Sequence, residues 1–86
     1  MSDWPDWWDW DLEFSSHLLK RMVDRGFLET DLREMMERAS GFREDFESGR
    51  WIVDTTHDST AWQVIVEPDD HDKLLVVITA FPIERP

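Results

Sequence analysis

The spacing of the hydrophobic residues changes once along the chain, near residue 41. Before this point Leu32, Met35, Met36 and Ala39 recur at i, i+3, i+4 and i+7, which is the period of an amphipathic helix. After it, residues 61–67 alternate between apolar and polar, and residues 74–78 are apolar without interruption. Alternation indicates a half-buried strand, and a short continuous run indicates a strand buried on both faces. Helices followed by strands predict an α+β domain.

Helix-capping residues predict two consecutive helices. Ser15 or Ser16 can cap the first helix, whose residues Leu18, Leu19, Met22 and Val23 are expected on one face, and Gly26 is a natural stop. Thr30 is the expected cap of the second helix, which the pair Ser40-Gly41 would end. The two helices should form a short helical hairpin.

Strands are predicted at residues 50–56, 61–67 and 73–81, with turns at residues 58–59 and 68–70. Residues 42–47 are expected to form a weak strand or a loop. The expected fold therefore places two N-terminal helices on one face of a three- to four-stranded antiparallel sheet. A chain of 86 residues allows one such domain, predicted over residues 14–86 and preceded by an arm at residues 1–13.

The charge of the chain is strongly acidic and unevenly distributed. Twenty acidic and nine basic side chains give a net charge of −11, which argues against sequence-independent binding to phosphate backbones. Residues 1–13 contain five carboxylates and no basic side chain, whereas residues 17–25 carry a net charge of +2. One short cationic segment is thus expected on an acidic protein. The chain has no cysteine, and the sequence predicts neither a metal site nor another cofactor.

The cationic segment places three side chains on one face of the first predicted helix. His17, Arg21 and Arg25 follow one another at i, i+4 and i+8. An imidazole, which exchanges protons near neutral pH, beside two guanidinium groups has the chemistry to bind and transform a phosphodiester. The alternative is a solvated helix face with no chemical role. Spacing alone leaves both interpretations open.

Several segments resemble a known family. Residues 14–27 read FSSHLLKRMVDRGF and contain the pattern His-x-x-x-Arg-Met-x-x-Arg-Gly; residues 49–51, 62–69 and 75–81 read GRW, WQVIVEPD and LVVITAF. Together these segments resemble the family called domain of unknown function 4258, over about residues 14–83. That family is similar to the barnase/EndoU/colicin/RelE group of small ribonuclease toxins.

The resemblance implies a RelE-like fold and a toxin-type endoribonuclease. His17, Arg21 and Arg25 would face the sheet edge where RNA binds, and Arg50 and Thr79 would complete the catalytic site. The reaction implied is metal-independent cleavage, in which the ribose 2′-hydroxyl attacks phosphorus. The implied partners are RNA, free or on the ribosome, and a cognate antitoxin.

His57 is a further catalytic candidate, because it follows a predicted strand at a position where catalytic residues are often exposed. With His17 it would form a general acid–base couple if the fold brought the two rings together. The alternative is a polar turn residue beside Asp58. His71 lies in an acidic turn that needs no metal to explain it.

The arm holds four tryptophans in seven residues: Trp4, Trp7, Trp8 and Trp10. Their indoles could pack over the domain or anchor a protein partner, since tryptophan is enriched at interface hot spots. The second function class is therefore a non-catalytic, antitoxin-like or regulatory module that binds a basic partner through its acidic surface and this arm. No apolar run is long enough to span a membrane, and no signal peptide is recognisable. We expect a soluble cytoplasmic protein, and a homodimer is compatible with its predicted edge strands.

Overall fold

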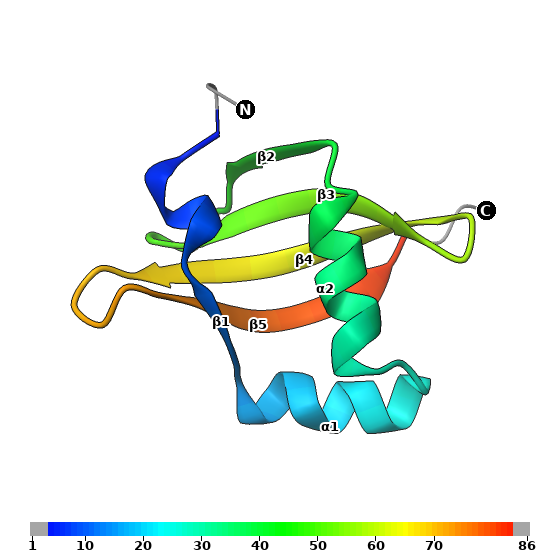
Figure 1. Cartoon of the computed structure of the whole chain (residues 1–86). Helices are drawn as coiled ribbons and strands as arrows, with labels where there is room; N and C mark the ends of the chain where they lie inside the picture. Colours follow the sequence, from blue (N-terminus) through cyan, green and yellow to red (C-terminus); the bar gives the residue numbers. More distant parts are fainter. Residues whose placement is uncertain (1–3, 84–86) are drawn as a thin grey trace.

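The computed structural model describes residues 4–83 of the chain. One short 3-10 helix, two α-helices and five strands follow one another in these residues. Their bounds are η1 (Asp6–Asp9), β1 (Asp11–Phe14), α1 (Ser16–Arg25), α2 (Glu29–Glu37), β2 (Gly41–Glu44), β3 (Trp51–His57), β4 (Thr60–Asp69) and β5 (Leu74–Pro82). Figure 1 shows the sheet with α2 across one face and α1 beyond β5.

The five strands form one mixed sheet in the order β1-β5-β4-β3-β2. β2, β3, β4 and β5 pair antiparallel, whereas β1 pairs with β5 in parallel, from Asp11 opposite Leu74 to Phe14 opposite Val77. The predicted three- to four-stranded antiparallel sheet is therefore wrong in strand number and in strand direction. The additional strand comes from residues 11–14, most of which the sequence assigns to the N-terminal arm.

β1 forms because its side chains alternate between the core and the opposite face of the sheet. Leu12 and Phe14 pack against the core, and the carboxylates of Asp11 and Glu13 are exposed. Parallel pairing is possible here because a long connection, which contains α1, α2 and strands β2 to β4, separates β1 from β5 along the chain.

Helix α1 begins and ends as its capping residues predict. The Ser15 hydroxyl accepts a hydrogen bond from the Leu18 N–H, and Gly26 ends the helix in the left-handed conformation at φ 68°. Only Leu18 and Met22 of the predicted apolar face are buried, and Leu19 and Val23 are exposed. Helix α2 begins at Glu29, before the predicted cap, because the Asp31 carboxylate accepts a hydrogen bond from the Leu28 N–H.

Both helices and one face of the sheet enclose a single core. Buried side chains of α1 and α2 meet the inward residues of β3, β4 and β5; the fully enclosed ones are Leu18, Leu32, Met35, Val53, Val64, Val66, Leu75 and Val77. The buried Thr55 hydroxyl of β3 donates a hydrogen bond to the Met35 carbonyl in the last turn of α2. This bond fixes α2 on the sheet and satisfies a polar group at a helix end. None of the helices within residues 4–83 combines the length and hydropathy that a membrane crossing requires.

Candidate functional site

Helix α1 lies along the edge of β5 that β1 leaves uncovered. The Ser15 N–H donates to the Val77 carbonyl at 3.1 Å, and its hydroxyl donates to the Ile78 carbonyl at 2.8 Å. At the other end of the helix, Nη1 of Arg25 donates to the Ala80 carbonyl at 2.6 Å. These bonds satisfy strand carbonyls that would otherwise be free, and they fix one flank of α1 relative to β5.

Next to Arg25 around the helix, the surface of α1 has a hollow of about 180 Å³. Its lining side chains are His17, Lys20, Arg21 and Asp24. All four are exposed, so the imidazole and both cationic groups can be reached from solvent. We call these four residues the α1 cationic cluster. Two of the predicted site residues, His17 and Arg21, thus lie together as expected from their spacing.

Lys20 and Arg21 differ from the other basic side chains of the described segment in having no partner. Arg33, Arg38, Arg43 and Arg50 each pair with a carboxylate. Lys73 lies over the Trp10 ring, and Arg25 binds a carbonyl. Two unpaired cations on a protein of net charge −11 leave a local surface that can attract an anion.

Thr79 lies on β5 between the two carbonyls that bind Ser15 and Arg25, and therefore next to α1. It pairs with Ile65, whereas its neighbour Ala80 is buried in the core. Because strand side chains alternate, Thr79 points to the face of the sheet opposite the core. Arg50 is held elsewhere, with Nε 3.3 Å from the Glu67 Oε1.

His57 lies at the end of β3, away from the α1 cationic cluster. Its ring meets Trp62 edge-on with centroids 5.5 Å apart, and its Nε2 lies 3.5 Å from the Asp58 carboxylate. Trp62 in turn contacts Phe27, which follows the C-terminal cap of α1. His17 is in the first turn of this ten-residue helix, which is about 15 Å long. The structure therefore does not bring the two histidines together.

The tryptophan arm packs onto the domain. Trp7 is buried in the core, with its ring 5.6 Å from Trp51 and 6.0 Å from Phe42. Trp8 and Trp10 are partly buried against the same core, and the Trp4 ring lies 4.4 Å from Trp8. The predicted partner-binding side chains thus contact one another and the sheet, and they enlarge the core of a small domain.

The structure adds residues to the site that the sequence did not single out as site residues. Lys20 and Asp24 complete the hollow, and their i+3 and i+7 spacing from His17 is the signal that places them there. Leu19 and Val23, expected in the core, lie on another flank of α1 and line an apolar groove. Among residues 4–83, no group of three histidine or acidic side chains is arranged to hold a metal ion.

Comparison with known proteins gives one result. The model of the family described as domain of unknown function (DUF4258) matches residues 14–82, which is most of the chain. The chain belongs to this family. The DUF4258 region begins at the last residue of β1, so η1 and the rest of β1 precede it. No curated protein and no solved structure gave a match.

Proposed function

We propose that the protein is an endoribonuclease that binds the RNA backbone at the α1 cationic cluster and cleaves it without a metal ion. The observation that carries this proposal is the pair of unpartnered cations, Lys20 and Arg21, beside the exposed imidazole of His17. Phosphate is the RNA group that such a pair attracts, and a nearby imidazole can move the proton that transesterification requires.

The proposed reaction is an internal transesterification. His17 removes the proton of a ribose 2′-hydroxyl, and the 2′-oxygen forms a bond to phosphorus while the bond from phosphorus to the 5′-oxygen breaks. Solvent protonates the leaving 5′-oxygen, which gives a 2′,3′-cyclic phosphate and a free 5′-hydroxyl. Arg21 and Lys20 stabilise the negative charge that develops on the phosphoryl oxygens. Arg25 and Ser15 hold α1 against β5, and Thr79 lies beside the helix.

The setting of this activity would be the cytoplasm, where RNA and ribosomes are present. An enzyme of this kind, acting as a toxin, needs a cognate protein to neutralise it. Arg50 and His57 lie outside the α1 cationic cluster, so the proposal assigns them no step in the reaction.

The test is cleavage of total RNA in the presence of a chelator, by the wild type, His17→Ala and His71→Ala. His71 is the matched control, because its side chain is 92% exposed in the β4–β5 turn and far from α1 in the chain. We expect His17→Ala to lose at least about 100-fold in rate, the usual contribution of a general base, and His71→Ala to retain wild-type activity. Equal thermal midpoints would show that both variants are folded. Equal activity of His17→Ala and wild type would contradict the proposal.

A second function is favoured by one observation, the net charge of −11. In this case the protein is a non-catalytic module whose acidic surface binds a basic partner, as an antitoxin-like or regulatory protein would. Absence of cleavage by the wild type, both with free RNA and with ribosomes, would favour this function. Removal of the arm cannot distinguish the two functions, because the buried Trp7 belongs to the core.

A further inference from the structure

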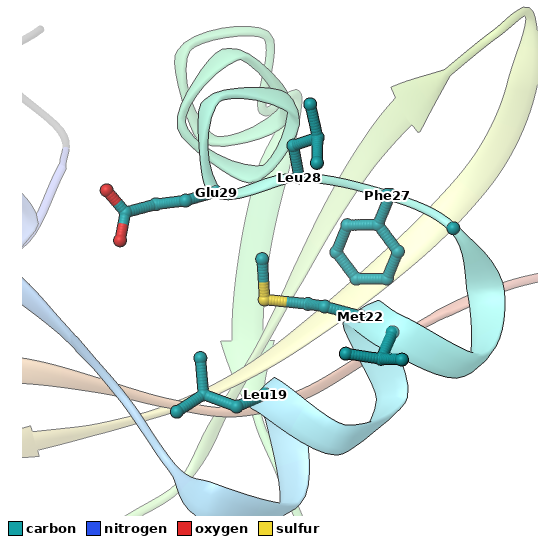
Figure 2. A pocket seen from close by; sticks show the side chains of 7 residues that line it. Leu19, Met22, Phe27, Leu28 and Glu29 are labelled. Carbon is teal, nitrogen blue, oxygen red and sulfur yellow. The ribbon is translucent and has the colours of Figure 1, made fainter.

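An apolar groove lies between α1 and α2. It has a volume of about 420 Å³. We call it the hairpin groove; its lining residues are Leu19, Met22, Val23, Gly26, Phe27, Leu28 and Glu29. Figure 2 shows Met22 and Phe27 between the side chains of Leu19 and Leu28, with Glu29 pointing away at the rim.

The side chains around the hairpin groove are unusually exposed for their type. Val23 is 82% exposed, Leu28 66% and Leu19 50%, and the remaining exposed large apolar side chain among residues 4–83, Phe46, lies in the β2–β3 loop. Exposure of three large apolar side chains around one groove costs hydration free energy, which a partner would recover. The groove is therefore a candidate interaction surface.

Charge identifies the kind of partner that fits this surface. Residues 15–40, which form the helical hairpin, contain five basic and five acidic side chains and are neutral, so the rest of the chain carries the whole net charge of −11. A basic partner would be attracted to the acidic remainder rather than to the neutral hairpin. Two copies of this chain repel each other where their acidic segments, before residue 15 and after residue 40, face one another. The hairpin has no net charge, so a contact between two hairpins brings no net charge together.

The surface carries both an exposed apolar side chain and an open position close to it. Val23 projects from α1 one turn before Gly26, and no atom lies within 4 Å of the position that a Cβ of Gly26 would take. In a two-fold dimer the same patch faces itself, so each copy supplies both a projecting side chain and a hollow. We propose that the protein forms a two-fold dimer through the hairpin groove, with Val23 of each copy seated beside Gly26 and Phe27 of the other.

This dimer is independent of the proposed ribonuclease activity. Val23 and Arg21 differ by two residues, or about 200° around the helix, so Arg21 lies on the flank of α1 opposite the groove, whereas Lys20, three residues before Val23, lies nearer to the groove. His17 and Arg21 remain open to solvent in the dimer. Failure of either proposal would leave the other standing.

Sedimentation equilibrium of the full chain, from about 1 to about 500 µM, tests the dimer, since weak homodimers dissociate in this range. We expect the wild type to approach twice the mass of the 10.3 kDa chain as concentration rises. Val23→Glu should remain a monomer throughout. Phe46→Glu adds the same charge at a fully exposed aromatic residue outside the groove, and it should dimerise as the wild type does. A wild type that stays monomeric, or a dimer that Val23→Glu leaves intact, would overturn the proposal.

Cross-linking tests the placement of Val23, because the chain contains no cysteine. The variant Val23→Cys should form a covalent dimer with a short bis-maleimide reagent, since Val23 of each copy lies in the interface. Phe46→Cys is equally accessible and should cross-link at only the slow rate of random collision. Equal rates for the two variants would contradict the proposed interface.

Discussion

Arg21 and Arg25 lie one turn apart on α1, but they have different roles. Arg25 donates a hydrogen bond to the Ala80 carbonyl, whereas Arg21 has no partner and lines the hollow with His17. The sequence predicts that both belong to one site, because both follow His17 at helical spacing. Spacing specifies a shared flank, but it cannot specify which guanidinium a strand carbonyl will bind.

Arg25→Met should therefore destabilise the protein, and Arg21→Met should not. A hydrogen bond from a charged donor contributes roughly 1.5–3 kcal/mol, and exposure of the Arg25 side chain reduces this to about 1 kcal/mol. Urea denaturation of the two variants, monitored by tryptophan fluorescence, measures the difference directly. Equal loss of stability in both variants would show that the bond to Ala80 contributes nothing.

Thr55 provides a second residue-level test. Its hydroxyl is the buried donor to the Met35 carbonyl, so Thr55→Val leaves that carbonyl without this partner. We expect a loss of about 1–3 kcal/mol in the free energy of unfolding. Thr56→Val is the matched control, because Thr56 is exposed on the same strand and should change stability by less than about 0.5 kcal/mol. A Thr55→Val variant as stable as Thr56→Val would contradict this assignment.

At the scale of elements, the helices and the β3–β4 hairpin were predictable because local residues determine them. Ser15 and Gly26 bound α1, and the turn between β3 and β4 contains Asp58 and Ser59, both at positive φ. β1 was not predictable in this way, because its partner β5 lies about 60 residues further along the chain. Its four residues also lie in an acidic, tryptophan-rich segment with no decisive period. The fifth strand and its parallel pairing therefore follow from tertiary contacts alone.

The packing of η1 gives a prediction at the same scale. Trp7→Ala removes a buried indole that touches Trp51 and Phe42, so we expect it to cost about 3–5 kcal/mol. Asp9→Ala alters an exposed residue of the same 3-10 helix and should be nearly neutral. Chemical denaturation of both variants is the measurement. Similar stability of the two would mean that the arm does not belong to the core.

At the scale of the whole molecule, a net charge of −11 on 86 residues opposes the compact state through self-repulsion. Within residues 4–83, four arginines pair with carboxylates at the surface, but exposed pairs contribute little. Added salt screens the repulsion more than it weakens these pairs. We expect Tm to rise by several degrees between about 20 and 500 mM NaCl, and equally in KCl. A Tm that falls with salt would show that the ion pairs dominate.

Only the part of the candidate site that depends on the local charge pattern of α1 was predictable from the sequence. The positive segment at residues 17–25 is visible in the sequence, and His17 and Arg21 do lie together on α1. The positions of Arg50, His57 and Thr79 depend on the register of the sheet and on which carboxylate or ring lies nearby. These positions depend on contacts between residues far apart in the chain, and residue spacing does not predict such contacts.

Backbone amide NMR during titration with a short single-stranded RNA tests the central claim, RNA binding at the α1 cationic cluster, most directly. A 2′-O-methylated oligonucleotide prevents cleavage, because the attacking hydroxyl is blocked. We predict that the largest shift changes fall on residues 17–24, and that Lys20→Met and Arg21→Met each weaken binding while Arg33→Met, which removes a cation already paired with Glu29, does not. Shift changes confined to the sheet or the loops, or no change at all, would contradict the assignment of this surface to RNA.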